Sequence, residues 1–476
     1  MIVRRTTAVA LLCSLAGLAP LAAADVLTVG PGLGVFDHLT VTAAIAAAAD
    51  GDEIVIEPGL YPENLLIDNK DITLRRSDTP GEVVLFGQSL GKVVSINAAI
   101  VTLRDLTITG GRSNAGAGVT SVSNSSVIIE RCIIEDNHSD TPSGVGGAVY
   151  ASRSLTMRES VVRNNSAIDD GGGLDLRGTG PHLVEDTVFA GNSAGDGVDP
   201  AGDTGGAAVV SAAVTFRGCS FVGNGAAGRG GALAVLEDIT TLESCTFDAN
   251  SAPRGGAVWV SDGDVVLASN CLFTGNDASA FGGVVYNEQV FDAVNCTFVN
   301  NTDSSDNDSF EGVRNDSITR LLNCVVVNPG PGSHGGSGNF LPRYSIVPEA
   351  PSSPDASGNF DADPMFVDAA GGDFRLGAGS PAIDAGDSLN TPATSQVPVL
   401  GLARDLDGLV RNLDDPDTAN SGVPAWELNI DLGAYEFQPG PDLGPGCSPA
   451  DIAAPFGVLN FFDVAAYIAE FNAGCP

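Results

Sequence analysis

Residues 245–260 read CTFDANSAPRGGAVWV, and this phrase returns along the middle of the chain. It consists of Cys-x-Phe-x-x-Asn, a short loop, and then Gly-Gly followed by small apolar residues. Residues 219–235 read CSFVGNGAAGRGGALAV, and residues 271–286 read CLFTGNDASAFGGVVY. A phrase that repeats at a spacing of mostly 25 to 28 residues is typical of a solenoid, in which each repeat forms one coil.

The Phe-x-x-Asn element, with Ile or Val in place of Phe in the first two copies, marks successive repeats. The copies are Ile134–Asn137, Val162–Asn165, Phe189–Asn192, Phe221–Asn224, Phe247–Asn250, Phe273–Asn276 and Phe298–Asn301. Short β-type runs alternate with Gly, Asn, Asp and Ser, and the repeats show no helical periodicity. Two or three short strands per coil predict an all-β fold, a right-handed parallel β-helix solenoid with coils about 4.8 Å apart.

The motif residues have predicted structural roles. Cys and Phe, two residues apart, point to the same face, which we expect to be the interior. Asn is expected to end the strand in the left-handed conformation and to bond to the Asn of the next coil. After the glycine pair, the first and third residues, such as Ala257 and Trp259, are expected to face inward. The second and fourth, such as Asp175 and Arg177, are expected to face outward.

Six of the nine cysteines occupy the same place in the repeat. They are Cys132, Cys219, Cys245, Cys271, Cys296 and Cys324. Stacked one coil apart, their Cα atoms would be within reach of a disulfide. Ser160 and Thr187 occupy the same column in other coils, which favours a ladder of free, buried thiols.

The chain is strongly acidic, with 59 Asp and Glu against 22 Lys and Arg and a net charge of −37. That field repels nucleic acid, anionic lipid and free polyanions, so no nucleic-acid partner is expected. It attracts cations, and Ca²⁺ is the expected cofactor because it prefers carboxylate and carbonyl oxygens. Lys70 and Lys92 are the only lysines, which nearly excludes a lysine base.

Residues 1–24 are interpreted as a signal peptide, because Arg4 and Arg5 precede an apolar stretch and an Ala-Ala-Ala cleavage site. No later stretch approaches the roughly 20 apolar residues that span a bilayer. The protein is therefore expected to be secreted or held at the cell surface without a membrane span. The expected parts are a parallel β-helix over 25–345, an Asp-rich closing segment of the β-helix over 346–440, and a linker and attachment tail over 441–476.

The N-terminal end of the solenoid has a predicted cap. Thr40 or Thr42 can start a short Ala-rich helix over residues 43–49. The surrounding stretch, residues 36–74, resembles the opening of pectinesterases and related pectin-active β-helix enzymes, which implies the pectin-lyase fold. The repeats over about 130–301 resemble the extracellular repeats of chlamydial polymorphic membrane proteins, which implies a surface adhesin. The pectinesterase motifs Gln-Asp-Thr and Asp-Phe-Ile-Phe-Gly are absent, and fold alone assigns no activity.

The segment after the repeats resembles the closing part of many bacterial secreted β-helix proteins, in DPMFVDAAGGDFRLGAGSPAIDAGD (363–387) and DLGAYEF (431–437). Between them lies a run rich in aspartate. Its members are Asp405, Asp407, Asp414, Asp415 and Asp417. They form either a Ca²⁺ loop or a solvated acidic turn, and the run lacks the glutamate twelve positions after the first Asp that an EF-hand loop has.

The tail, residues 447–476, follows the linker QPGPDLGPG and resembles half of a dockerin, of the type found at the C-termini of planctomycete secreted proteins. Three residues match the later positions of a dockerin calcium loop: Gly457, Asn460 and Asp463. Ala453 and Pro455 stand where ligand carboxylates belong. The resemblance implies a small helical tail that attaches to a cell-envelope component or a cohesin-like protein. A disulfide between Cys447 and Cys475 would then staple this small unit.

Enzymes on this fold that cleave acidic polysaccharides need paired carboxylates, or a Ca²⁺ cluster with an arginine base, on one outward strip. The candidates are Asp169, Asp170, Asp175 and Arg177, as a Ca²⁺-dependent lyase site of pectate-lyase type. A second candidate is residues 301–312, whose Asn-Thr-Asp is similar to a polygalacturonase motif. Its carboxylates crowd into one loop, whereas a glycoside hydrolase places them on both sides of one bond.

Two classes of function remain open. The first is a non-catalytic surface or matrix protein, a scaffold that binds glycans or surfaces and attaches through its tail. The second is a polysaccharide-active enzyme, either the lyase or a glycoside hydrolase acting on acidic polysaccharide. An enzyme should gather Asp, Arg and Lys from adjacent coils into a cleft, while a binder should present a broad face. Thinly spread charges and scarce lysine favour the non-catalytic binder.

Overall fold

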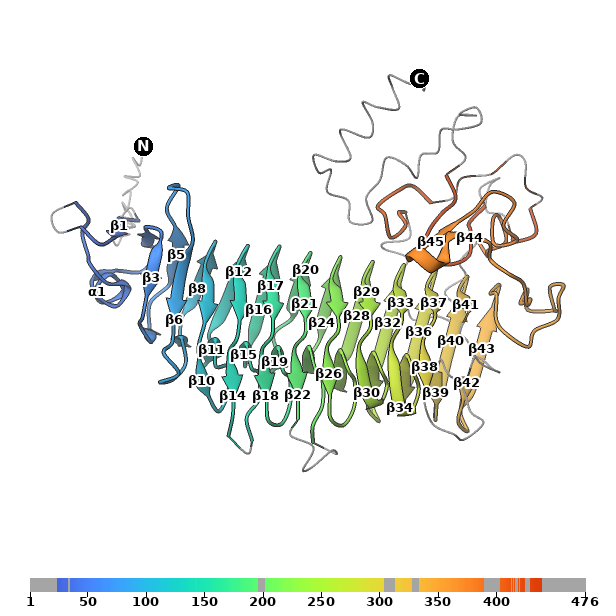
Figure 1. Ribbon diagram of the computed structural model, residues 1–476, viewed down its shortest axis with the longest axis horizontal. Helices are drawn as coiled ribbons and strands as arrows, with labels where there is room; N and C mark the ends of the chain where they lie inside the picture. Colours follow the sequence, from blue (N-terminus) through green and yellow to red (C-terminus); the bar gives the residue numbers. More distant parts are fainter. Residues whose placement is uncertain are drawn as a thin grey trace, which may run out of the picture.

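The computed structural model describes residues 24–32, 35–141, 143–195, 202–303, 313–327, 334–388, 403–411, 413, 415, 418, 420–423 and 429–438. The predicted signal peptide up to residue 23 and the whole predicted attachment tail, with Cys447 and Cys475, lie outside the described residues. Within them, parallel strands stack side by side into one elongated solenoid (Figure 1). The predicted all-β parallel β-helix is confirmed, and it has about 11 coils.

Each central coil passes through four parallel sheets in the described residues, more than the two or three strands predicted. Sheet I contains β1 (Val26–Val29), β2 (Glu53–Ile56), β5 (Ile72–Arg76), β8 (Ile100–Arg104), β12 (Ser126–Glu130), β16 (Ser154–Arg158), β20 (His182–Glu185), β24 (Val214–Arg217), β28 (Ile239–Glu243), β32 (Val265–Ser269), β36 (Val290–Val294), β40 (Ile318–Leu322) and β43 (Asn339–Arg343). Sheet II contains β3 (Gly59–Tyr61), β6 (Val83–Phe86), β9 (Thr107–Thr109), β13 (Ile133–Glu135), β17 (Val161–Arg163), β21 (Val188–Ala190), β25 (Ser220–Val222), β29 (Thr246–Asp248), β33 (Leu272–Thr274), β37 (Thr297–Val299) and β41 (Val325–Val327).

The other two sheets follow in each coil after sheet II. Sheet III is short and contains β10 (Arg112–Ser113), β14 (His138–Ser139), β18 (Ser166–Ala167), β22 (Ser193–Ala194), β26 (Gly225–Ala226), β30 (Ser251–Arg254), β34 (Asp277–Phe281) and β38 (Thr302–Asp303). Sheet IV contains β4 (Leu65–Asp68), β7 (Val94–Asn97), β11 (Val119–Val122), β15 (Val149–Ala151), β19 (Leu174–Arg177), β23 (Ala208–Ser211), β27 (Leu233–Glu237), β31 (Val258–Val260), β35 (Val285–Asn287), β39 (Val313–Asn315) and β42 (His334–Gly335).

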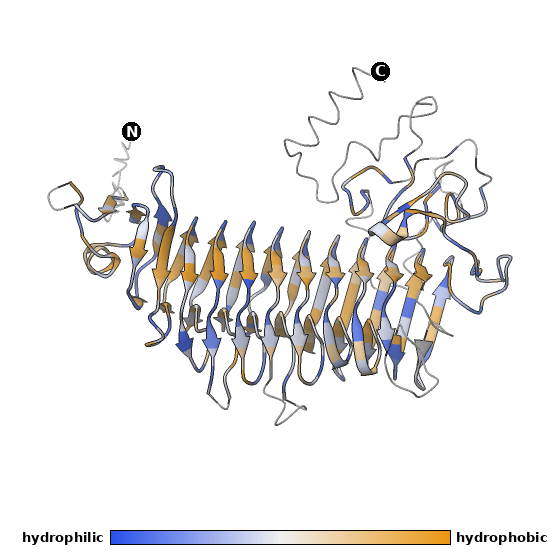
Figure 2. Cartoon of the chain, in the orientation of Figure 1, coloured by the Kyte–Doolittle hydropathy of each residue, from blue (hydrophilic) through white to orange (hydrophobic). Residues whose placement is uncertain are grey.

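The interior is filled by columns of like side chains, and many of the strands around it are largely orange in Figure 2. Phe221, Phe247 and Phe273 stack ring on ring, with centroids 4.6 and 4.7 Å apart. The six repeat cysteines are buried and free, as predicted. Burial raises the pKa of Cys132 to about 12, which keeps this thiol protonated and makes it a packing group rather than a nucleophile.

The asparagines of the motif form a ladder of hydrogen bonds. Nδ2 of Asn224 donates to Oδ1 of Asn250 at 3.0 Å, and Nδ2 of Asn250 donates to Oδ1 of Asn276 at 2.9 Å. The predicted bond between coils is confirmed. The predicted left-handed conformation of these asparagines is wrong, because the residue before each one adopts it, as Asn164 does at φ 54° and Ala249 at φ 53°.

The predicted inward position of Trp259 is also wrong. The register of sheet IV places Trp259 in the same outer column as Asp175. Val258 and Val260 take the inward positions and belong to the main hydrophobic core. Trp259 instead packs in a separate outer cluster with its column neighbours.

A three-glycine run explains this error. The prediction equated Gly172-Gly173 of one coil with Gly255-Gly256 of another. In the structure, Gly171 and Gly255 are equivalent, since both adopt left-handed backbone at φ 67° and 66°. The two strands were therefore aligned one residue out of register. Because side chains alternate between the two faces of a strand, a shift of one residue exchanges the inward and outward positions.

The N-terminal cap is confirmed and begins two residues earlier than predicted. Helix α1 (Val41–Ala47) starts after Thr40, whose Oγ1 accepts a hydrogen bond from the backbone N–H of Ala43 at 3.1 Å. Its apolar side covers the first coil, at the blue end of Figure 1. None of the helices in the described residues has the length and apolar character needed to cross a membrane.

The closing segment folds back along the side of the last coils (Figure 1). It contains the antiparallel strands β44 (Phe366–Asp368) and β45 (Asp373–Leu376) and the 3-10 turn η1 (Ala369–Gly371). Phe374 packs on Leu272 and Val299 of sheet II. The backbone N–H of Ala434 donates to Oγ1 of Thr297 at 2.9 Å, so the contact joins chain segments far apart in sequence.

Candidate functional site

The four candidate catalytic residues lie together at strand β19. Asp169 and Asp170 occupy the turn before the strand, and Asp175 and Arg177 lie two residues apart on its outer face. The turn is fixed by both neighbouring coils: Gly146 N–H donates to Asp170 O, and Gly171 N–H donates to Thr204 O, each at 2.9 Å. Backbone ladders, rather than flexible loops, therefore position this group.

Asp175 and Arg177 form a bidentate ion pair. Nε and Nη2 of Arg177 donate to the two carboxylate oxygens of Asp175, both at 2.8 Å. Asp175 is 0% exposed, and burial raises the pKa of its carboxyl while the Arg177 bonds oppose that rise. The same bonds raise the pKa of Arg177, whose guanidinium also lies 5.8 Å from the ring centroid of Tyr150. An arginine held protonated in this way is poorly suited to act as a base.

Asp170 is the carboxyl of the group with a pKa near neutrality. Burial raises the pKa of Asp170 to about 6, and the hydrogen bond from Oγ1 of Thr204, at 2.7 Å, opposes that rise. Repulsion from Asp169 and Asp175 adds to the increase. In chemical terms this side chain could exchange a proton near neutral pH, whereas its two neighbours on β19 are engaged with one another.

The predicted calcium ligands are only partly described. Asp414 and Asp417 lie outside the described residues. Asp405 accepts hydrogen bonds from the backbone N–H groups of Leu409 at 2.7 Å and Glu436 at 3.0 Å, which closes a loop. Asp415 accepts one from Oγ1 of Thr418, and burial raises the pKa of Asp407.

Metal binding by these aspartates stays a prediction. In the part of the chain that the structure describes, no three His, Cys, Asp or Glu side chains are grouped so that they could hold a metal ion. Asp405 and Asp415 accept hydrogen bonds from other residues of the closing segment.

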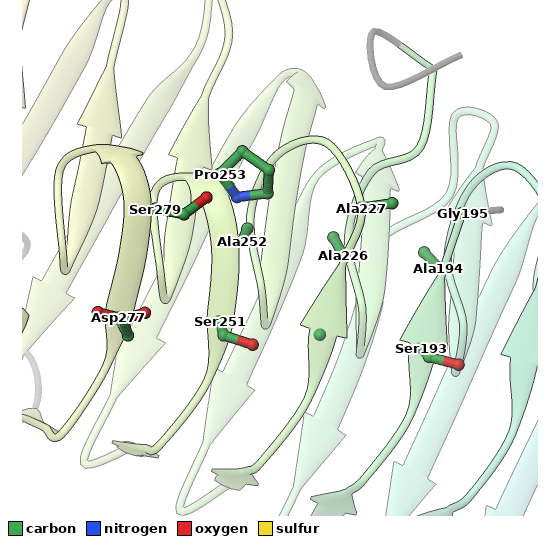
Figure 3. Close-up of a pocket in the computed structure, with 11 residues that line it drawn as sticks. Ser193, Ala194, Gly195, Ala226, Ala227, Ser251, Ala252, Pro253, Asp277 and Ser279 are labelled. Carbon is green, nitrogen blue, oxygen red and sulfur yellow. The ribbon is translucent and has the colours of Figure 1, made fainter. Parts of the chain in front are cut away.

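A groove of about 400 Å³ runs across the outer face of sheet III (Figure 3). Small residues form its floor, so no large side chain covers the backbone of the coils there. Polar and apolar groups line its two sides: Ser193, Ser251 and Asp277 on one, and Ala227, Pro253 and Ser279 on the other. A Cβ on Gly225, in the middle of the groove, would meet only Ser251, at 3.6 Å.

The sequence prediction missed this groove, although a signal for it exists. The first groove position in each coil directly follows the ladder asparagine, and successive coils place Ser193, Gly225, Ser251 and Asp277 there. A run of small residues at one motif position predicts a depression along the solenoid. Interpreting the motif as scaffold assigns no surface role to the residue after Asn.

Comparisons with known proteins agree with the coil architecture. A family model described as a right handed beta helix region matches residues 64–229 and 170–334. No curated protein matches the chain. Among solved structures, pectate lyase Pel9A is 14% identical with a TM-score of 0.42, and the match covers 88% of this chain and 98% of that one.

Two further structures are similarly distant. The deglycosylated pectin methylesterase from Aspergillus niger is 17% identical with a TM-score of 0.34, covering 57% of this chain and 85% of that one. A mannuronic acid specific polysaccharide family 6 lyase from human gut microbiota is 13% identical with a TM-score of 0.34, covering 67% and 82%. At these scores the likeness carries no argument about activity.

Proposed function

The chain belongs to the right-handed β-helix family, and on that premise we propose that it is an exported, cell-surface or matrix-associated scaffold that binds glycans without catalysing a reaction. The observation that supports the non-catalytic reading most directly is the bidentate pair of Asp175 and Arg177. A lyase that used Arg177 as its base would need it deprotonated, and the buried carboxylate of Asp175 holds it protonated. Two of the candidate catalytic residues are thus bound to each other in an ion pair.

The groove on sheet III is the proposed binding surface. It is open and shallow, and it crosses several coils, which suits an extended polymer rather than a compact metabolite. Ser193, Ser251 and Asp277 can hydrogen-bond to sugar hydroxyls, and Pro253 offers an apolar contact. In this proposal, export through residues 1–24 and attachment through residues 441–476 present the groove outside the cell.

Filling the groove tests the proposal. Gly225→Tyr places a ring where a Cβ would meet Ser251 only at an ordinary contact distance, and where no left-handed backbone adds strain. The matched control, Val222→Tyr, adds the same ring to the exposed outer face of sheet II in the same coil. Pull-down of the full chain on insoluble polysaccharides and cell-envelope material should fall at least fivefold for Gly225→Tyr and stay unchanged for the control. Equal retention of both variants would refute the groove as the binding surface.

The second candidate function is the Ca²⁺-dependent polysaccharide lyase. One observation favours it, namely that Asp170, with a pKa of about 6, lies beside Asp169 and Asp175. Eliminase and reducing-sugar assays on pectins and alginates, with and without Ca²⁺, separate the two functions. Unsaturated products formed by the native chain and lost in Asp170→Asn would establish the lyase and end the non-catalytic proposal.

A further inference from the structure

Two arginines in adjacent coils differ from their neighbours in lacking an acidic partner. Most arginines here are tied to carboxylates; on sheet I, for example, Arg158 and Arg217 both bind Glu185 at 2.7 Å. Within the described residues, Arg229 and Arg254 have neither an ion pair nor a side-chain hydrogen bond. In a chain of net charge −37, two such guanidiniums are an unusual local concentration of available positive charge.

Both guanidiniums are stacked on aromatic rings. Backbone pairing places Arg229 and Arg254 at equivalent positions of successive coils. Each side chain reaches over the outer column of sheet IV one coil further on: Arg229 lies 4.5 Å from the ring centroid of Trp259, and Arg254 lies 5.8 Å from that of Tyr286. Stacking fixes the planes of the guanidiniums and leaves their N–H edges as donors.

Each aromatic partner also donates a hydrogen bond to a carboxylate. Nε1 of Trp259 donates to Oε2 of Glu288 at 2.8 Å, and the hydroxyl of Tyr286 donates to Asp316 at 3.4 Å. Those carboxylates therefore bind the rings and form no ion pair with either arginine in the described residues. The result is a row of two oriented cations that repel one another at a coil separation of about 4.8 Å. A bound anion would relieve that repulsion.

This row borders the groove. Pro253, which lines the groove, directly precedes Arg254, and Ala227 lies two residues before Arg229. We propose that Arg229 and Arg254 form an anion subsite at the edge of the groove and hold the carboxylate or sulfate groups of an acidic glycan. The proposal rests on the glycan-binding function proposed above and names its ligand class. A planar guanidinium donates two parallel hydrogen bonds to either oxyanion.

The acidic field of the whole chain does not prevent such binding. At physiological ionic strength charges are screened beyond about 8 Å, so a sugar at the groove meets the local arginines rather than the distant carboxylates. A short acidic oligosaccharide avoids most of the repulsion that a long polyanion would meet. The proposed ligand is therefore best tested as an oligosaccharide.

The test is titration of the full chain with three probes: an oligogalacturonate, a sulfated galactan oligosaccharide and a neutral cello-oligosaccharide. The double variant R229Q/R254Q should weaken binding of the acidic probes at least tenfold. The control R112Q/R131Q also removes two positive charges, from exposed arginines paired with Asp140 and Asp105, and should stay within twofold of the native chain. Whichever acidic probe binds with the higher affinity shows whether the subsite prefers a carboxylate or a sulfate.

A second readout does not depend on the arginine variants folding. The chain has two tryptophans, so Trp426→Phe leaves Trp259, beneath Arg229, as the only tryptophan, whose emission can be excited selectively. Acidic probes should change its fluorescence. Unchanged affinity in R229Q/R254Q, or binding without a change in emission, would overturn the subsite. Binding of the neutral probe alone would overturn the subsite and leave glycan binding intact, and binding of none of the probes would overturn both.

Discussion

Asp264 is a buried carboxyl in the turn that leads into β32, and it lies among other acids. Oδ2 of Asp264 has no hydrogen-bond partner among the described residues. Burial raises the pKa of Asp264 to about 7, and repulsion from Glu237 and Asp262 adds to the rise. In the unfolded chain the same carboxyl ionises near pH 4. The folded protein therefore retains a proton that the unfolded chain has already lost.

The pH dependence of stability follows from that difference. Between about pH 4 and 7 the unfolded state binds fewer protons than the folded state, so the free energy of unfolding falls as pH rises. Asp264→Asn cannot ionise and should gain thermal stability over the native chain progressively across this range, with a constant gain above pH 7. Thermal unfolding at pH 4, 5.5 and 8 measures it, with the exposed Asp361→Asn as control. A gain already complete at pH 4 would contradict the assignment to ionisation.

Single residues also show where prediction from sequence succeeds. Cys245 and Phe247 were placed inside because their identities recur, and recurrence in a solenoid means stacking. The prediction for Trp259 was wrong because inward and outward positions were numbered from the glycine pair. A run of three glycines contains two such pairs and does not show which one is equivalent to the pair in other coils. The shared face of Asp175 and Arg177 was predicted from their spacing, but their ion pair was not, and the complete burial of Asp175 depends on coils that no local pattern specifies.

The sheets are stabilised by columns that run along the solenoid. Phe247 is the middle of such a column, between Phe221 and Phe273. Strand membership was predictable from alternation of apolar residues. The short sheet III was not, because its strands have as few as two residues, as at Gly225–Ala226, and two residues carry no periodicity. The arginine row beside the groove escaped prediction for a related reason, since each arginine lies about one repeat from the aromatic ring on which it stacks.

Truncating the column tests how much it contributes. Phe247→Ala removes a ring with zero exposure from two stacks and leaves a cavity between coils, so the free energy of unfolding should fall by about 3–5 kcal/mol. Phe247→Leu refills most of that volume and should cost clearly less. Urea unfolding followed by circular dichroism provides the comparison. Val222→Ala, on the exposed face of β25, is the control and should change stability by about 0.5 kcal/mol or less. An Ala variant as stable as this control would refute the role of the stack.

The whole molecule combines a regular rod with an irregular segment docked on its side. Asn323 makes part of that contact: its Oδ1 accepts from the N–H of Asp387 at 2.8 Å, and its Nδ2 donates to the carbonyl of Asp387 at 3.3 Å. The closing segment has no repeat, so its sequence predicted its existence through resemblance but not its position. Contacts across more than sixty residues have no local signature.

Removing that clamp should loosen the segment without unwinding the rod. Asn323→Ala loses both bonds to Asp387, so limited proteolysis within residues 360–438 should accelerate several-fold. Asn295→Ala is a close control, because both asparagines are buried and share left-handed backbone, at φ 52° and 54°, yet neither side-chain atom of Asn295 has a hydrogen-bond partner in the described part of the chain. Equal cleavage rates in the two variants would show that strain, and not the clamp, controls docking.

The asparagine ladder has a consequence for how such a chain can change in length. Every rung offers the same amide to the rung above, so an entire repeat can be inserted or excised without disturbing the pairing elsewhere. The rod then works as a ruler graduated in steps of about 4.8 Å. Natural variants with more or fewer repeats between the groove and the C-terminal end would therefore differ in the distance between these two parts by whole multiples of that step.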